Sequence, residues 1–284
     1  MIFLDLSQII ISNLMVEVFR NGGSDYDDNM LRHMILNSIR SARLKYKSEY
    51  GDMIICSDDK DYWRKSAFPY YKAARKKAKE KSDIDWAKVY RSIDQIKYDL
   101  DQFFPYKFIQ VPGAEADDII GTIAHREGTF LNNGEPILIL SGDKDYFQLH
   151  QYGNIKQFDP VKKRLVTTPN PERYLFEHIL RGDTGDGIPN ILSPDNSFVI
   201  GQRQKPITQK RIDDWDWCTD FMKEQELRGF KRNEMLIDLS KVPTDIQSQI
   251  TAKYDEPNTK NRSQLMDYFM KHKLKNLMES LSDF

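Results

Sequence analysis

The sequence has little cysteine, almost no net charge and no long apolar run. Its 284 residues include only two cysteines, Cys56 and Cys218, so we expect no disulfide scaffold and a reducing, intracellular environment. No run of about 18 apolar residues occurs, and "MIFLDLS" reaches Asp5 at once, so neither a transmembrane helix nor a signal peptide is predicted. The net charge of −1 argues against a polycation that coats nucleic acid. We therefore expect a soluble, cytoplasmic protein that makes no membrane contact.

The residues that are present suffice for a globular core of α/β type. Hydrophobic residues make up 39% of the chain and aromatic residues 12%. Short apolar runs alternate with amphipathic stretches such as 29–46, which indicates a mostly parallel central sheet flanked by helices. The predicted strands are 2–6, 53–57, 107–111 and 136–140. Residues 155–166 are typical of an added hairpin that turns at Asp159 and Pro160.

After about residue 180 the pattern becomes mostly helical and is interrupted by "GDTGDGIPN", "SPDN", "VPTD" and "DEPNTKN". We place a boundary near residue 181. Residues 1–180 are predicted to form the α/β core, and residues 181–284 are predicted to form a helical subdomain.

Acidic residues gather where the predicted strands end. They are Asp5, Asp58, Asp143 and Asp145 after strands, Glu115, Asp117 and Asp118 at a helix start, and Asp183 and Asp186 in "GDTGDGIPN". The carboxyl ends of parallel strands share one edge of the sheet, which is where such folds bind ligands. We therefore expect these side chains to converge although they lie far apart in the sequence.

One such aspartate alone is typical of a turn or of a helix N-cap. The whole set is not explained in this way, because caps do not require pairs of acids at every exit along one edge. Unbalanced carboxylates repel each other, so divalent cations are predicted to compensate them. The donors are all oxygens, with no His or Cys nearby in the pattern, which favours Mg²⁺, with Mn²⁺ as a substitute, over Zn²⁺. The acids are too many for one ion, so we predict two ions about 4 Å apart, as in phosphoryl-transfer sites.

A basic segment, "YWRKSAFPYYKAARKKAKEKSDIDW" (62–86), follows the second of these strands. Between Arg64 and Lys81 it carries eight Lys or Arg residues against one acid, Glu80, with aromatic residues interleaved. A solvated helix face is the simpler explanation of an isolated basic run. Beside an acidic metal site, cations that meet phosphates and rings that stack on bases predict a nuclease.

"GAEADDIIG", "ILSGDKDYFQL" and "GDTGDGIPN", with "YYKAAR" in a basic insertion, resemble the structure-specific 5′-nuclease (flap endonuclease) family. The start "FLDLSQI" and the segment "YWRKSAFPYYK" are most similar to its bacteriophage ribonuclease H branch. The resemblance implies a PIN/5′-nuclease-like core, a basic helical arch at about 60–104 and a C-terminal helix–three-turn–helix element. It implies that the nine acids above bind metal, with Asp143 catalytic. It also implies that Lys72 and Arg75 are catalytic and grip the scissile phosphate, assisted by Arg64, and that Lys76 binds nucleic acid.

The sequence departs from the family after "GDTGDGIPN". Many relatives have a glycine-rich hairpin and a helix start there, and this chain has "NILSPDNSFVIGQRQKPITQKR" instead. We therefore do not expect the monovalent-ion loop that those relatives often have. Basic residues in this segment remain candidates for binding the phosphates of duplex nucleic acid, namely Arg203, Lys205, Lys210 and Arg211. Only four residues precede Asp5, so no N-terminal docking tail for a sliding clamp is expected.

The resemblance implies a Mg²⁺-dependent 5′→3′ exonuclease and flap endonuclease that removes RNA primers during lagging-strand replication. Its substrates would be duplex DNA with a 5′ flap or nick and RNA–DNA hybrids, and the expected form is a monomer. Replisome partners would be a single-strand-binding protein or a sliding clamp. Alternatives are a PIN-type RNA-cleaving nuclease, a non-catalytic DNA-structure binder, and a phosphatase with Asp5 as nucleophile. The last usually needs an acid two residues on, where this chain has Ser7.

Overall fold

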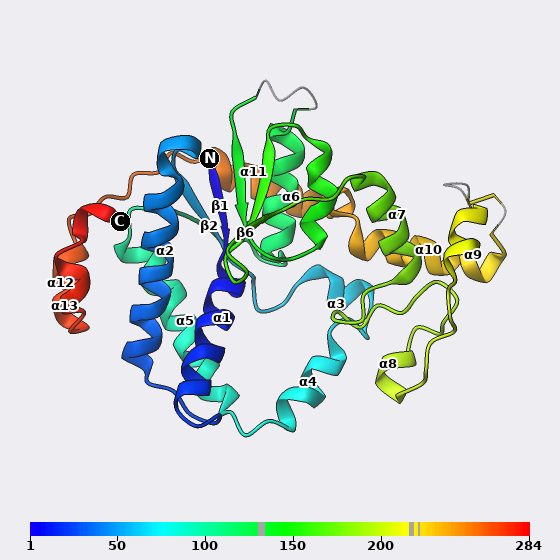
Figure 1. The fold of residues 1–284 in the computed structure, drawn as a ribbon, viewed down its shortest axis with the longest axis horizontal. Helices are drawn as coiled ribbons and strands as arrows, with labels where there is room; N and C mark the ends of the chain where they lie inside the picture. The colour runs from blue at the N-terminus through cyan, green and yellow to red at the C-terminus, as the bar shows by residue number, and fades with distance from the viewer. Residues whose placement is uncertain (130–133, 216–218, 221) are drawn as a thin grey trace.

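A six-stranded sheet forms the centre of the computed structural model, which describes residues 1–129, 134–215, 219–220 and 222–284 (Figure 1). The strand order is β3-β2-β1-β4-β5-β6. The strands are β1 (Ile2–Asp5), β2 (Met53–Cys56), β3 (Lys107–Ile109), β4 (Ile137–Leu140), β5 (Ile155–Asp159) and β6 (Arg164–Val166). The first five are parallel, and β6 runs antiparallel to β5. The predicted α/β class with a mostly parallel sheet is confirmed.

The short apolar runs form strands because both of their faces are covered. Every residue of β1, β2 and β4 is buried, as expected for central parallel strands. The predicted strands are confirmed to within two residues at each end. The hairpin at 155–166 is also present, but β5 pairs with β4, so the hairpin extends the main sheet instead of being added to its surface.

Helices cover both faces of the sheet and continue beyond its edge. They are α1 (Leu6–Arg20), α2 (Asp28–Tyr50), α3 (Trp63–Ala67), α4 (Ala73–Glu80), α5 (Trp86–Phe103), α6 (Ala116–Glu127), η1 (Asp145–Gln151), α7 (Pro171–Arg181), α8 (Ser197–Ile200), α9 (Gln209–Trp215), α10 (Glu224–Ile237), η2 (Leu239–Lys241), α11 (Thr244–Asp255), α12 (Leu265–Lys271), α13 (Lys275–Met278) and η3 (Leu281–Asp283). Apolar side chains of α1, α2 and α5 pack on one face, and those of α6, η1 and α11 pack on the other.

The basic segment forms a narrower arch than the sequence predicts. Every residue of α4 is at least partly exposed, and Figure 1 shows this helix crossing away from the sheet. In contrast, α5 is anchored in the core by Val89, Ile96 and Leu100. The predicted arch at 60–104 is therefore too wide at its C-terminal end, because the buried face of α5 belongs to the core.

The predicted helical subdomain, residues 181–284, does not pack as one unit. Helices α7, α9 and α10 share their own apolar clusters, but η2 and α11 join the cluster under the sheet, and α12 and α13 join the cluster with α2 and α5. The chain therefore returns to the α/β core from residue 239 onward. The helix after the "GDTGDGIPN" turns is α8, which is a single turn of four residues, so the expected helix–three-turn–helix element has a short second helix here.

Two further expectations concern cysteine and the membrane. Cys56 is buried as a free thiol in β2, whereas Cys218 lies outside the described residues. Within the described ranges no helix combines the length and the apolar character needed to cross a lipid bilayer.

Candidate active site

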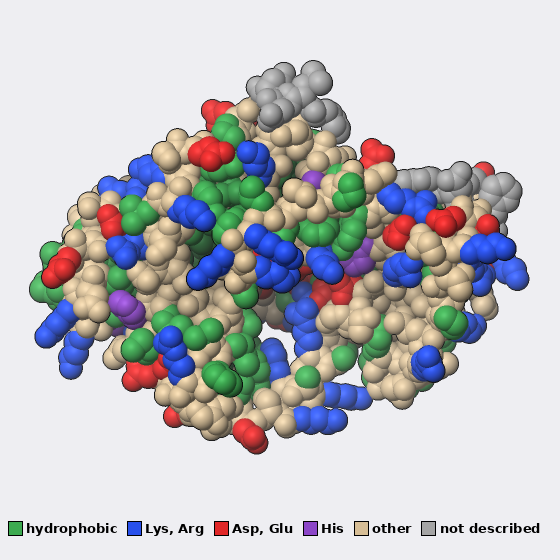
Figure 2. Space-filling model, viewed as in Figure 1, with side chains coloured by type: hydrophobic (Ala, Val, Ile, Leu, Met, Phe, Trp, Pro, Cys, Tyr) green, Lys and Arg blue, Asp and Glu red, His purple; other side chains and the backbone are tan. Residues whose placement is uncertain are grey.

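The acidic side chains from remote segments meet at the carboxyl edge of the sheet. A cavity of about 260 Å³ is lined by Asp5, Asp58, Glu115, Asp117, Asp143, Asp145 and Asp186, together with Lys72 and Arg75. Asp183 lines an adjoining cavity that also contacts Asp143 and Asp145. Figure 2 shows acidic side chains in a central hollow, with Lys and Arg side chains around its rim. The convergence expected from strand topology is therefore present in the structure.

Two of these acids join the strands to the neighbouring helices. Asp5 ends β1 and caps α1, because its carboxylate accepts from the Gln8 backbone N–H at 3.3 Å. Asp58 follows β2 and accepts from Ser7 Oγ at 2.5 Å and from the Ala116 N–H at 2.7 Å. Ser7 therefore orients a carboxylate in place of the second acid that an aspartyl phosphatase would carry.

The loop that carries Asp143 is held by residues that sequence patterns did not reveal. The buried Gln157 side chain on β5 donates to the carbonyls of Ser141 at 2.8 Å and Asp143 at 2.6 Å. The Gly142 N–H donates to Gln8 Oε1 at 2.6 Å. A Cβ atom on Gly142 would lie 2.7 Å from the Asp159 carboxylate, so a larger residue at this turn would have to displace that side chain. A partner on another strand, and not a local motif, fixes this loop.

Burial and mutual repulsion raise the pKa of several of these acids. Burial, followed by the charge of Asp58, raises the pKa of Asp5 to about 7. Burial and the nearby Asp117 raise the pKa of Glu115 to about 7. Burial and Asp143 also raise the pKa of Asp145 well above its usual value. These carboxylates therefore lack full compensation by positive charge, and their oxygen donors fit hard divalent cations.

The base of the arch supplies part of that positive charge. Lys72 Nζ lies 2.5 Å from Glu115 Oε1, and Arg75 pairs with Asp186. The Tyr71 hydroxyl bridges Glu115 at 3.0 Å and Asp186 at 2.8 Å. Lys72 has a left-handed backbone with φ of 55°, and its N–H donates to the Asp186 carbonyl at 2.7 Å. The arch is thereby fastened to the loop that carries Asp186.

Arg64 does not reach the surface, so its predicted contact with nucleic acid is wrong. It is 1% exposed, and its guanidinium pairs with Glu115 at 3.0 Å and with Asp118 at 2.7 Å. Its Nε also donates to the Leu236 carbonyl at 2.8 Å. Arg64 therefore balances buried carboxylates beneath the cavity and joins α3 to α10.

Asp118 lies behind the cavity and contacts protein on every side. A ligand oxygen of each of Glu115, Asp117 and Asp118 lies within 4.8 Å of the others, which would permit a shared cation. However, Asp118 is fully buried, and it accepts from the Trp63 indole at 3.1 Å and from the Glu115 N–H at 2.9 Å. Together with the Arg64 pair these contacts give Asp118 the role of a capping and positioning residue at the start of α6.

The other predicted nucleic-acid residues lie on two surfaces. Lys76 is exposed on α4, at the arch. Lys205 lines a cavity of about 800 Å³ with Arg181 and Arg203. Lys210 is exposed at the start of α9, whereas Arg211 pairs with Glu226. Arg181, which the sequence did not single out, lines the same cavity as Lys205 and pairs with Glu177 at 3.8 Å.

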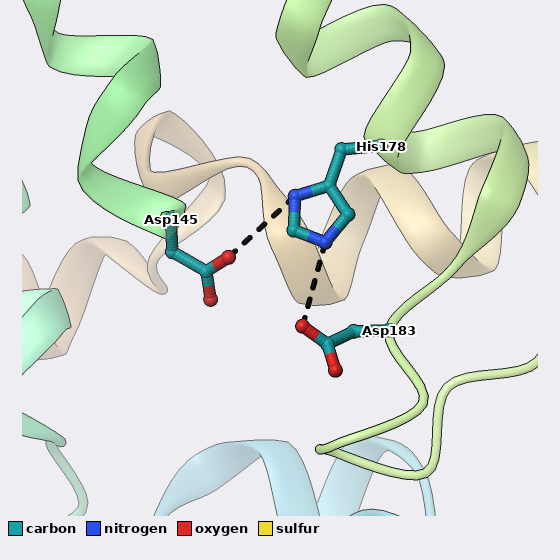
Figure 3. A group of neighbouring side chains, drawn as sticks. All are labelled: Asp145, His178 and Asp183. Carbon is teal, nitrogen blue, oxygen red and sulfur yellow. Dashed lines mark ion pairs between the residues drawn. The ribbon is translucent and has the colours of Figure 1, made fainter. Parts of the chain in front are cut away.

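A histidine stands among the acids, contrary to the expectation of a site without nitrogen donors. His178 on α7 lies between Asp145 and Asp183, with Nδ1 3.5 Å from Asp145 and Nε2 3.4 Å from Asp183 (Figure 3). The sequence gave no sign that His178 belongs to the site. It lies five residues before Asp183, within helix α7 and outside the acidic motifs. The packing of α7 against η1 brings it to the site.

Two family profiles together match the chain from residue 27 to residue 284. The family described as "5′-3′ exonuclease, N-terminal resolvase-like domain" matches residues 27–175, which is more than half of the chain. The chain belongs to this 5′–3′ exonuclease family. The family described as "T4 RNase H, C terminal" matches residues 170–284. The resemblance inferred from the motifs is confirmed.

Two similar curated proteins are nucleases by name. The chain is 31% identical to the Ribonuclease H of Enterobacteria phage T4 over 293 residues, which covers 99% of this chain and 94% of that protein. It is 27% identical to Flap endonuclease Xni of Shewanella woodyi over 187 residues, which covers 63% of this chain and 69% of that protein. Together with the carboxylate cavity, these relatives identify the chain as a nuclease that hydrolyses phosphodiester bonds.

Solved structures share the fold at low sequence identity. A bacteriophage T5 flap endonuclease, in a pseudo-enzyme–product complex with DNA and metal ions, matches with a TM-score of 0.59 at 17% identity. That match covers 88% of this chain and 96% of the other. The T5 5′-exonuclease with bound zinc matches with a TM-score of 0.57 at 18% identity, covering 89% and 97%.

Proposed function

We propose that the chain is a Mg²⁺-dependent 5′→3′ exonuclease and flap endonuclease that removes RNA primers and adjacent DNA during lagging-strand replication. The observation that carries the proposal is one cavity lined by seven acidic side chains and by two basic ones, Lys72 and Arg75. A role in replication would place it in the cytoplasm. A single chain supplies every acid of the cavity, so we propose that it acts as a monomer.

Two divalent cations fit the donor set because it brings many carboxylates together, and burial raises the pKa of Asp5, Glu115 and Asp145 among them. Asp5, Asp58, Glu115 and Asp117 would hold one, and Asp143, Asp145, Asp183 and Asp186 would hold the other. When bound, such ions supply Lewis-acid activation of water and charge stabilisation at the phosphate and the leaving oxygen.

Lysine and arginine side chains position the substrate on either side of that cavity. Lys72 and Arg75 lie at its wall, where they meet the phosphate next to the cleaved bond. The exposed lysines of α4, including Lys76, hold the unpaired 5′ strand by its phosphates. Duplex phosphates bind at the surface around Arg203 and Lys205, with Arg181 beside them.

The residues that contact the substrate are those that recognise phosphate, so RNA and DNA strands are both accepted. The basic residues named above are proposed to meet phosphate oxygens, which DNA and RNA share, and the cavity itself is lined by carboxylates. In-line attack by water leaves a 5′-phosphate and a 3′-hydroxyl. Tyr71 is hydrogen-bonded to Glu115 and Asp186, so it positions acids and is not free to act as a nucleophile.

Digestion of two labelled substrates tests the proposal. The substrates are an RNA–DNA primer duplex and a duplex with a 5′ DNA flap, each incubated with and without Mg²⁺. We expect Mg²⁺-dependent release of short 5′-phosphorylated products from both. Asp143→Asn is expected to abolish cleavage and to keep duplex binding, because it removes a cavity carboxylate without changing the basic surfaces. Turnover by that variant, or equal cleavage after chelation, would contradict the proposal.

A further inference from the structure

His178 shares a second cavity with acids of the proposed cation site. The imidazole is 12% exposed, and it lines a cavity of about 470 Å³ together with Asp143, Asp145 and Asp183. One ring nitrogen and one oxygen from each of Asp145 and Asp183 lie within 4.8 Å of one another. Figure 3 shows the ring between the two carboxylates, which come from the start of η1 and from the loop after α7.

The two contacts of His178 come from different ring nitrogens. Nδ1 lies 3.5 Å from Asp145 and Nε2 lies 3.4 Å from Asp183, both longer than the roughly 2.7–3.2 Å of a good N–H···O hydrogen bond. Two ligands on bonds of about 2.1 Å lie roughly 3.0 Å apart at a right angle and roughly 3.4 Å apart at a tetrahedral angle. Ligands on opposite sides of the ion lie roughly 4.2 Å apart. One ring nitrogen and one oxygen of each carboxylate lie within 4.8 Å of one another, so side-chain rotation that closes these gaps to ligand spacing would place all three on one cation.

The imidazole is oriented by its surroundings. His178 is in the last turn of α7, and its carbonyl accepts from the N–H of Gly182, which ends the helix with φ of 69°. Tyr174, one turn earlier, packs edge-on against the imidazole with 5.6 Å between ring centroids. Phe147 packs against Tyr174 in turn, at 5.1 Å. The same helix end that turns the chain toward Asp183 thus fixes the ring beside it.

We propose that His178 is a nitrogen ligand of the cation held by Asp145 and Asp183. This rests on the proposed metal-dependent nuclease function and adds a donor to it. Imidazole suits first-row transition ions, whereas Mg²⁺ prefers oxygen ligands and keeps its waters. This cation position therefore favours Mn²⁺, Co²⁺ or Zn²⁺ over Mg²⁺, and the other position, with oxygen donors alone, does not.

Pulsed electron paramagnetic resonance of the Mn²⁺-loaded wild-type protein tests the nitrogen ligand directly. Electron spin-echo modulation from a coordinated ¹⁴N is expected, and it should change to the ¹⁵N pattern when the protein is labelled with ¹⁵N-histidine. His178→Gln should remove the modulation, whereas His33→Gln, a change on the distant helix α2, should keep it. Calorimetric titration should show the Mn²⁺ to Mg²⁺ affinity ratio of the His178→Gln protein falling at least about tenfold.

The outcomes separate this inference from the proposed function. If wild-type protein binds Mn²⁺ without nitrogen modulation, the inference is wrong and the metal-dependent nuclease stands. If the modulation persists in His178→Gln, another residue supplies the nitrogen and the inference is also wrong. If neither Mn²⁺ nor Mg²⁺ binds, both proposals fail. The wild-type measurement decides even if the variant does not fold.

Discussion

Replacing Arg64 by methionine is expected to destabilise the fold instead of weakening the grip on nucleic acid. The guanidinium is buried and compensates Glu115 and Asp118, which are themselves buried. Methionine fills much of the volume but leaves those carboxylates without their partner. Breaking a buried ion pair from one side costs about 3–5 kcal/mol, because the remaining charge stays desolvated.

The size of the effect is measured by urea denaturation and by thermal melting. For a chain of this length about 1 kcal/mol corresponds to roughly 2 °C, so the Arg64→Met protein should melt roughly 6–10 °C lower. The neighbouring Lys65→Ala is the matched control, since Lys65 is 42% exposed on its side chain and makes an ordinary surface pair with Asp61. Surface pairs contribute about 0–1 kcal/mol. The control should therefore melt within about 2 °C of the wild-type protein.

Equal melting of Arg64→Met and wild-type protein would refute the reasoning about the buried charge. Binding gives a second check. Because Arg64 does not reach the surface, the salt dependence of duplex binding by the folded variant should match that of the wild-type protein. A reduced salt dependence would mean that the side chain meets phosphates after all.

Three further results are expected. The double variant Lys72→Ala, Arg75→Ala should cleave more slowly in single-turnover assays. The slope of log binding constant against log salt concentration should fall by about one for each phosphate that is no longer neutralised. An unchanged slope would show that neither side chain meets a phosphate. Without divalent ions, the folded protein holds protons on Asp5 and Glu115 up to a pKa of about 7, whereas the unfolded chain loses them near pH 4. The unfolding free energy should therefore fall as the pH rises from about 4 to about 7, by about 4 kcal/mol for Asp5 alone. Added Mg²⁺ should stabilise the protein more at pH 8 than at pH 5. An unfolding free energy from urea denaturation that does not change with pH would contradict this. Phe269→Ala should cost about 3–5 kcal/mol in denaturant unfolding because the ring is fully buried, while the exposed Met270→Ala should cost less than about 0.5 kcal/mol.

The sheet and the acidic edge could be predicted because they follow from local patterns. The runs "IFLD", "MIIC" and "ILIL" are apolar up to their final residues, and parallel topology alone brings the residues that end or follow them to one edge. Asp5 and Asp143 were therefore foreseeable as neighbours, although they lie far apart in the sequence. The basic composition of α4 was equally visible.

The remaining features depend on contacts between distant segments, which carry no periodic signal. Arg64 belongs to a basic run, and only the packing of α3 against α10 shows that it points inward. Gln157 holds the Asp143 loop because β5 happens to pair with β4. His178 becomes a neighbour of Asp145 through the contact of α7 with η1. The packing of α12 and α13 against α2 and α5 likewise joins segments that lie far apart in the sequence.

The return of the last residues to the core has a consequence for folding. Phe284 is fully buried beside Phe104, and the Asp283 carbonyl accepts from Arg43 on α2 at 2.7 Å. Phe284 thus belongs to the same apolar cluster as side chains of β1, β2 and β4, which lie far before it in the sequence. Removing Phe284 should therefore destabilise the side of the sheet that α1, α2 and α5 cover, and not the two terminal helices alone.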